Sequence, residues 1–596
     1  MEEDFSIEQM RYLEGLASGL QIAKTNMPDS SKAESDYGVP IGINPDALHI
    51  QAQNKYLQAG KKLCNEEKAK REHHPFDYWD QMVKNANEGV FPKGVDVFRY
   101  KFHGLFYVAP AQNSFMSRLR MPNGIINATQ FRGIADLTSQ YGGSYTHITT
   151  RANLQLREVG AHDATKLLLG MQDLGVMNRG SGADNIRNVT GNPLSGISAD
   201  EIYDTRELAR ELHYYILYHR DMYGLPRKFN IAFDGGGAVS VLEDTNDIGF
   251  AAVKVEDNSN SIKPGVYFRM QLGGITGHED FACDTGILLT PEQCIPMAKA
   301  VIRVFIDNGD RTDRNKARLK YLLDDWGLEK FMQAVTEQCE FELVKFPLEN
   351  CITRSKIDRM AHIGVHKQKQ EDLSYIGIVC PVGRIETEQM YGLADIAEQY
   401  GSGCIRLTVW QNLIISDIKN ENIDTVKERI ESLGLHWTAS NIRANLIACT
   451  GSWGCKFANA NTKLHATNIA DYVESKISLD QPINIHLTGC HHSCAQHYIG
   501  DIGLLATKVD VGEDSDPIDG YDVFLGGGFS DSQAIAKEFM KNVDAELIPQ
   551  LIANILEVYM RHRTDESEPF FEFAARNTCE TLLELLQHKE EVKIAS

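Results

Sequence analysis

The same pattern of apolar and polar positions occurs twice in this chain. PNGIINATQFRGIADLTSQYGGSYTHITTRANLQL begins at Pro122 and PVGRIETEQMYGLADIAEQYGSGCIRLTVWQNLII begins at Pro381, a shift of 259 residues. In both segments Ile, Leu and Ala recur at helical spacing as far as a Tyr-Gly pair, and a β-branched run follows. Each copy therefore predicts a helix with a glycine C-cap, then a strand, then a second helix.

The register of the two copies continues well beyond these segments. The tripeptide NIR at 185–187 returns at 441–443, and QLGG from Gln271 is echoed by FLGG from Phe524. A period of this length is too long for a solenoid and indicates duplication of a two-part module. The mixture of helix and strand predicts an α+β fold whose copies are related by a pseudo-twofold axis.

Residues 1–95 have no counterpart in the repeat. An apolar helical pattern runs from Ile7 to Leu20. A basic run follows, which we interpret as a solvated helix face; it contains Lys61, Lys62, Lys68, Lys70 and Arg71. This part of the chain is predicted to be a helical extension.

Composition limits the class of protein. With 42% hydrophobic residues the chain can bury several cores, and a net charge of -22 argues against a nucleic-acid surface. The acidic start MEEDFSIEQMRY does not resemble a secretory signal, and no apolar stretch has the length of a membrane span. We therefore expect a cytoplasmic protein without a membrane partner.

Four cysteines form two close pairs near the end of the chain. Cys449 and Cys455 have five residues between them, and Cys490 and Cys494 have three. Four thiolates on short loops suit either zinc or an iron-sulfur cluster. The absence of any CxxC favours the cluster and leaves a structural protein that binds zinc through these four cysteines as the alternative. The remaining eight of the 12 cysteines are scattered singly.

The cysteine segments ACTGSWGC and TGCHHSC, followed by DIG at 501–503, resemble those of the siroheme-dependent nitrite and sulfite reductases. The resemblance covers the chain from about residue 95 to its end. It implies that all four cysteines hold a 4Fe-4S cluster and that Cys494 is also the proximal ligand of siroheme iron. It also implies a tandem duplication of a ferredoxin-like half-domain plus a siroheme/iron-sulfur domain.

On this resemblance the chain divides into five parts. The N-terminal extension, 1–95, precedes a first ferredoxin-like half-domain, 96–180, and a first siroheme-binding domain, 181–370. A second half-domain, 371–440, and the 4Fe-4S/siroheme domain, 441–596, follow.

The resemblance also implies an anion site. Segments that match the family contain Arg118 in FMSRLRMPNG, Arg187 in DNIRNVTGNP and Lys228 in LPRKFN. Asn230 stands where sulfite-reducing members commonly have a second lysine, and a dianionic sulfite needs more positive charge than nitrite. Nitrite is therefore the expected substrate, with ferredoxin-dependent reduction of sulfite to sulfide as the alternative.

Other basic residues are candidates for siroheme contacts. Arg151, Asn153 and Arg157 lie on the strand of the first repeat. Arg311 and Arg314 could clamp carboxylates or could form an ordinary helix face with i,i+4 pairs. The histidines around the cysteines are expected to be neighbours or surface groups, because thiolate already fills the proximal position.

These expectations combine into an enzyme that reduces nitrite to ammonium with six electrons. No GxGxxG follows a strand, so no nicotinamide or flavin site is predicted and a separate carrier must supply the electrons. Ferredoxin is the family expectation and flavodoxin a possible substitute. Because such carriers are acidic, the basic run from Lys61 to Arg71 is a candidate docking patch. A bare electron carrier is a third hypothesis, but the duplicated scaffold is larger than that role needs.

Overall fold

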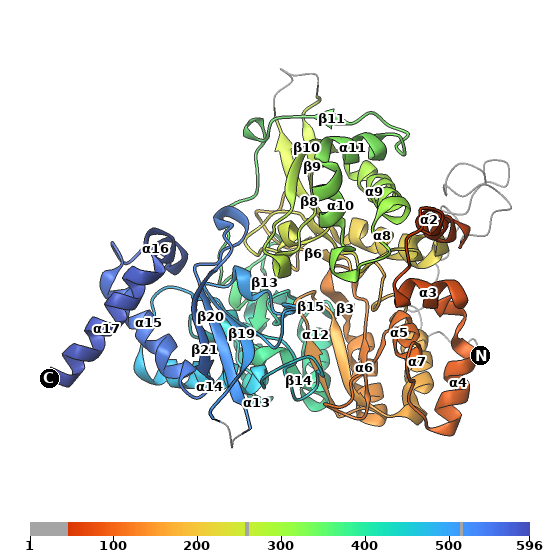
Figure 1. Ribbon diagram of the computed structural model, residues 1–596. Coiled ribbons are helices and arrows are strands. Elements are labelled where there is room, and N and C mark those ends of the chain that lie inside the picture. Colours follow the sequence, from red (N-terminus) through yellow and green to blue (C-terminus); the bar gives the residue numbers. More distant parts are fainter. Residues whose placement is uncertain (1–45, 257–261, 513–515, 596) are drawn as a thin grey trace, which may run out of the picture.

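The computed structural model describes residues 46–256, 262–512 and 516–595. The pattern predicted between Ile7 and Leu20 lies outside the described residues. Figure 1 shows three lobes around a common centre. In the described ranges, none of the helices combines the length and apolar character that crossing a bilayer requires.

The repeated segments form two five-stranded sheets that exchange one strand. Strand β14 of the second copy pairs antiparallel with β4 of the first, and β3 of the first pairs with β15 of the second. The first sheet has the order β1 (Leu105–Tyr107), β2 (Phe115–Arg118), β5 (Leu154–Val159), β4 (Tyr145–Ile148) and β14 (Arg384–Glu386). The second has the order β12 (Gly364–Lys367), β13 (Leu373–Ile378), β16 (Leu413–Lys419), β15 (Cys404–Leu407) and β3 (Ile125–Asn127). The two copies therefore fold as one interlocked body.

Paired helices cover these two sheets. Each copy has the predicted order of helix, strand and second helix, which the repeat places twice: α6 (Ala128–Tyr141) and α7 (Ala164–Asp173), then α12 (Thr387–Tyr400) and α13 (Ile423–Ser432). Phe131 of α6 and Leu393 of α12 are fully buried in one core that both copies share. The α+β fold and the tandem duplication predicted from the sequence are confirmed.

Both long helices end at the Tyr-Gly pair, as predicted, but glycine is needed there for space. Gly142 has extended backbone, with φ of -135°. A Cβ at Gly142 would lie 2.7 Å from the carbonyl oxygen of Arg157, and one at Gly401 would lie 2.5 Å from that of Ser416. Glycine thus lets strands β5 and β16 pass directly against the ends of the helices.

Two further sheets repeat a second topology. Three parallel strands are followed by two antiparallel ones in each copy. The first contains β6 (Thr190–Gly191), β7 (Ile231–Asp234), β8 (Ile248–Val255), β9 (Gly265–Leu272), β10 (Cys283–Leu289) and an added β11 (Val344–Lys345). The second contains β17 (Leu446–Ala448), β18 (Ile485–Thr488), β19 (Ile502–Val509), β20 (Ile518–Leu525) and β21 (Lys537–Asp544). QLGG and FLGG fall at the ends of β9 and β20, as the repeat predicts.

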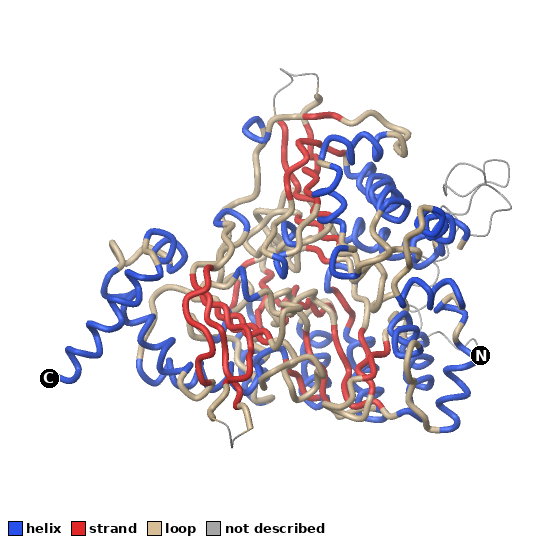
Figure 2. Tube along the Cα trace, in the orientation of Figure 1, coloured by secondary structure: helices blue, strands red, loops and turns tan. Residues whose placement is uncertain are grey.

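Helices pack on these sheets from different parts of the chain. The first sheet is covered by α8 (Arg206–Tyr218), α9 (Cys294–Asn308), α10 (Leu319–Trp326) and α11 (Leu328–Thr336). The second is covered by α14 (Thr462–Lys476), α15 (Ile548–His562), α16 (Phe570–Arg576) and α17 (Cys579–Ala595). Figure 2 shows α17 projecting from the body at one edge.

The described part of the N-terminal region is held by a buried ion network. It contains α2 (Ala47–Gln58), α3 (Asn65–Glu72), α4 (Trp79–Glu88) and the short α5 (Asp96–Tyr100). Lys70 and Glu67 form a buried pair on α3, and Lys70 also donates to the Leu225 carbonyl at 2.9 Å. Arg311 donates to Glu67 at 2.8 Å. The interpretation of the basic run as a wholly solvated face is therefore wrong for Lys70, although Lys61, Lys62, Lys68 and Arg71 are exposed.

Removing Arg311 should destabilise the fold. Arg311→Met leaves the Glu67 carboxylate buried without its arginine, and breaking a buried pair in this way costs about 3–5 kcal/mol. Urea unfolding of Arg311→Met and of the unchanged protein measures the difference in their free energies of unfolding. Arg132→Met is the matched control, because Arg132 pairs with Asp395 and Glu398 on the surface and should contribute about 1 kcal/mol or less. Equal stability of Arg311→Met and the unchanged protein would contradict this account.

Candidate active site

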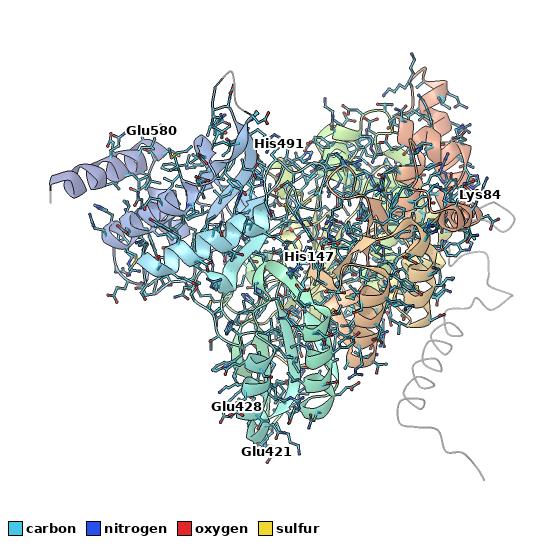
Figure 3. The ribbon with its side chains drawn as sticks, turned by 90° about the horizontal axis from the view of Figure 1, so that it is seen from below. Lys84, His147, Glu421, Glu428, His491 and Glu580 are labelled. Atoms are coloured by element: carbon cyan, nitrogen blue, oxygen red, sulfur yellow. The ribbon has the colours of Figure 1, made fainter. Side chains whose placement is uncertain are left out.

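A cavity of about 570 Å³ lies where the two copies meet. Its wall includes His147, which Figure 3 shows near the centre of the molecule. Of the described residues that line it, none is Asp or Glu and eleven are Lys or Arg: Lys101, Arg118, Arg151, Arg157, Arg187, Arg227, Lys228, Arg314, Arg318, Lys456 and Lys463. The cavity thus concentrates positive charge inside a chain whose net charge is -22.

All four predicted cysteine ligands line this cavity. The loop with Cys449 and Cys455 follows β17, and the loop with Cys490 and Cys494 follows β18. Because β17 and β18 are parallel neighbours, their carboxyl ends meet at one sheet edge. A Cβ at Gly489 would lie 2.6 Å from that of Ala458, so glycine is needed for the two loops to approach.

The thiols interact with one another. Burial is the main cause that raises the pKa of Cys490 to about 12, and the charges of the other three thiols add to it. Burial, followed by repulsion from Cys449, likewise raises the pKa of Cys494, which lines the cavity. In the described residues no three His, Cys, Asp or Glu side chains already converge on a metal-ion position. Thiolates so placed need added positive charge to stay ionised, which an iron-sulfur cluster supplies.

The three predicted anion-binding residues meet in the same cavity. Arg118 ends β2, while Arg187 and Lys228 precede β6 and β7. The Arg118 guanidinium lies over the Phe106 ring at 4.6 Å. Among the described residues neither Arg118 nor Lys228 has a hydrogen-bond partner for its charged group, so both are available to a ligand. Asn230 lines the cavity beside them.

Arg187 is partly committed to the protein. Its two terminal nitrogens donate to the carbonyls of Ser181 and Ala183 at 2.6 and 2.7 Å. Its Nε is buried and has no partner in the described part of the chain. The Arg187 guanidinium is therefore held by the protein, and part of its hydrogen-bonding capacity is unused.

Burial and neighbouring positive charges lower the pKa values of basic groups in the cavity. Desolvation, followed by repulsion from Arg318, lowers the pKa of Lys228 to about 7. Desolvation is also the main cause that lowers the pKa of Arg151 to about 9. A bound anion would offset the desolvation of these cations and their mutual repulsion, so the cavity favours anionic ligands.

The predicted siroheme contacts on the first repeat have different surroundings. Arg151 donates to Asn246 at 2.8 Å and to the Asn188 carbonyl at 2.6 Å. Asn153 accepts a hydrogen bond of 2.6 Å from Thr149 and so fixes the turn between β4 and β5. Both side chains line the cavity, as does Arg157.

Arg311 and Arg314 are separated by the fold. Arg314 lines the cavity, yet its guanidinium donates to both carboxylate oxygens of Asp184 at 2.9 and 2.7 Å. Arg311 is not brought to the cavity, because its guanidinium is fully buried against Glu67 and the carbonyls of Gly224 and Ile306. The prediction of a siroheme contact for Arg311 is therefore not supported by its position.

Five of the eleven lining cations were not among the site residues predicted from the sequence: Lys101, Arg227, Arg318, Lys456 and Lys463. Arg227 directly precedes Lys228, and Lys456 directly follows Cys455, so adjacency to a selected residue was an available signal. Lys101 and Lys463 belong to no recognisable motif.

The histidines near the cysteines divide by burial. His486 and His497 are buried, and His486 bonds to the Ala495 carbonyl at 2.9 Å. His491 and His492 are exposed, and His492 lies 3.3 Å from the sulfur of Cys490. Figure 3 shows His491 at the edge of the C-terminal lobe.

The pseudo-equivalent position in the first copy lacks the same chemistry. When β7–β8 is placed on β18–β19, Gly236 falls at Cys490 and Ser240 at Cys494. Under the repeat Trp410 replaces Arg151, and its indole nitrogen donates to the Ser240 carbonyl at 3.2 Å. At the positions of Cys490 and Cys494, therefore, only the second copy has thiols.

Two domain families match the chain. The family described as nitrite and sulphite reductase 4Fe-4S domain matches residues 182–343 and 438–594. The nitrite/sulfite reductase ferredoxin-like half domain matches residues 109–174 and 366–433. The four cysteines lie inside the second 4Fe-4S match.

Individual relatives agree with these matches. The ferredoxin–nitrite reductase of Synechococcus elongatus is 33% identical over 506 residues, which cover 83% of this chain and 96% of that protein. The chloroplastic ferredoxin–nitrite reductase of Zea mays is 31% identical over 475 residues, which cover 78% and 81%. The structure of the Mycobacterium tuberculosis NirA protein superposes with a TM-score of 0.81 at 26% identity and covers 88% of this chain and 98% of that one. The chain belongs to the nitrite and sulphite reductase family.

Proposed function

We propose that this protein is a ferredoxin-dependent nitrite reductase, which reduces nitrite to ammonium with six electrons. The observation that carries the proposal is one cavity that unites four thiols with eleven Lys and Arg residues and no carboxylate among its described lining. Relatives that share most of the chain are named ferredoxin–nitrite reductase, which supports nitrite over sulfite.

The residues of the cavity fit a 4Fe-4S cluster and a siroheme. Cys449, Cys455, Cys490 and Cys494 would hold the cluster, with Cys494 shared with siroheme iron. A siroheme carries eight carboxylates, so it suits a cavity whose described lining has eleven Lys and Arg residues and no Asp or Glu. When bound, the cluster stores electrons and the siroheme supplies the iron at which nitrite is reduced.

The basic side chains bind the substrate and supply protons. Arg118, Arg187 and Lys228 would hold the nitrite oxygens and stabilise their growing negative charge as each N–O bond breaks. Lys228 is the proton donor in this scheme. The overall reaction consumes one nitrite, six electrons and eight protons and yields one ammonium and two waters. The positive cavity attracts the anionic substrate and repels the cationic product.

Electrons come from a reduced ferredoxin, with flavodoxin as a substitute. The docking patch predicted on the basic run now rests on the exposed Lys61, Lys62, Lys68 and Arg71, and it stays a prediction. The cytoplasmic location predicted from the sequence also stays a prediction.

Asn230→Lys should shift the enzyme toward sulfite. A second lysine beside Lys228 adds charge for a dianion, and a hydrogen bond to a charged group contributes about 1.5–3 kcal/mol. An energy of this size corresponds to a rise of about tenfold or more in the ratio of sulfite to nitrite turnover. The assay uses reduced ferredoxin with both substrates side by side and quantifies ammonium and sulfide.

The matched control for this substitution is Asn315→Lys, which adds the same charge at the exposed rim of the cavity. Its turnover ratio should stay unchanged. If the unsubstituted protein reduced sulfite faster than nitrite, the proposed function would be wrong. If both lysine variants shifted the ratio equally, the role of Asn230 would be wrong.

Nitrite binding should weaken as pH rises above neutrality. Because burial lowers the pKa of Lys228 to about 7, its charge is lost as pH increases through that value. An anion binds the protonated lysine more tightly than the neutral one, so KM for nitrite should rise as pH increases through this value, by at most about tenfold for each pH unit because Arg118 and Arg187 still bind the anion. Lys228→Arg keeps its charge throughout and should flatten this dependence. Measuring KM for nitrite between about pH 6 and pH 9 at constant ionic strength tests this prediction. An equal increase of KM with pH in Lys228→Arg and in the unchanged protein would contradict it.

A further inference from the structure

Arg157 links the first copy to the first cysteine loop. It lies on β5, and its side chain is buried. Its Nη1 donates to the Gly454 carbonyl at 3.0 Å, and its Nη2 donates to the Thr450 hydroxyl. Gly454 and Thr450 lie in the loop that carries Cys449 and Cys455, and Nη2 also donates to the Gln155 side chain of β5 at 3.0 Å. The guanidinium therefore fixes the shape of that loop.

The loop is shaped closely around this guanidinium. A Cβ at Gly454 would lie 3.2 Å from Nη1 of Arg157 and 3.0 Å from the methyl of Thr450, so any larger residue crowds the contact. In the second copy the repeat places Ser416 at the position of Arg157. The arginine is thus present only in the first copy, whose strand β5 lies against the loop that carries Cys449 and Cys455.

No carboxylate in the described residues forms an ion pair with Arg157, and its Nε has no partner there. The nearby groups that can favour its charge are Tyr145, Cys455 and Cys449. Tyr145 donates to Glu158 at 2.8 Å, and burial raises its pKa, so it stays neutral. Since an unpaired buried charge is strongly destabilising, thiolates are the remaining counter-charge.

We propose that Arg157 positions the cysteine loop and acts as the counter-ion of the cluster held there, rather than as a clamp for siroheme carboxylates. The inference rests on the proposed cluster. Reduction by the carrier adds one electron to the cluster, and a fixed positive charge beside it stabilises that added negative charge. Arg157 therefore raises the cluster's reduction potential.

Redox titration of the purified holoenzyme, followed by electron paramagnetic resonance without nitrite, tests the charge. Arg157→Met should lower the equilibrium constant for cluster reduction at least about tenfold, which is 59 mV for a one-electron couple. Arg157→Lys keeps the charge and should retain most of the potential. The control Arg384→Met removes a half-exposed arginine that lies over Tyr145 and should leave the potential unchanged.

Hydrogen exchange of the same loaded proteins tests the positioning. Amides of residues 450–454 should exchange faster in both Arg157 variants, because neither lysine nor methionine reproduces the forked contact, and they should keep their protection in Arg384→Met. Should Arg157→Met fold by circular dichroism but hold no cluster while Arg384→Met holds one, that loss supports the inference.

A fully loaded Arg157→Met with unchanged potential and unchanged exchange would overturn the inference. This outcome differs from failure of the proposed function, in which the unsubstituted protein itself would contain no iron-sulfur cluster.

Discussion

Buried positive charge that exceeds the carboxylates paired with it is the constraint on which this structure depends. The chain carries 82 acidic and 60 basic residues, yet the described lining of its central cavity contains basic residues and no acidic ones. Buried charges are stable only when they are paired. Asp184 pairs with Arg314 and Arg227, and Asp247 pairs with Arg318. For the other lining cations the negative charge must come from the cysteine thiolates, cofactor carboxylates and an anionic substrate. The same constraint explains why the pKa of Lys228 falls so far below its usual value.

The duplication explains how one cavity receives two kinds of chemistry. Exchange of β3 and β14 locks the copies together, so the strands of the first copy face the cysteine loops of the second. Most of the anion-binding charge then comes from one copy and all four thiols from the other. Gly236 and Ser240 at the equivalent positions show that the copies have diverged into complementary roles.

Sequence alone predicted those features that local patterns encode. The repeat, the helix ends at Tyr-Gly and the four cysteines each have a local signature, and the structure places all four thiols in one cavity. The strand exchange has no such signature, because a three-residue strand pairs equally well within its own copy. Arg311 and Arg314 lie in one basic run, and only tertiary packing sends Arg311 to Glu67 and Arg314 to Asp184. Lys101 and Lys463 reach the cavity from segments without a motif.

The metal content and visible spectrum of the purified protein, compared with those of Cys494→Ser, test the central claim most directly. If the cavity holds a siroheme joined to a cluster, the protein contains more iron than acid-labile sulfide and shows a Soret band with a visible charge-transfer band. Cys494→Ser then loses both cofactors. A colourless protein that contains zinc instead of iron would contradict the account, and a variant that loses the cluster but keeps siroheme would disprove the shared ligand.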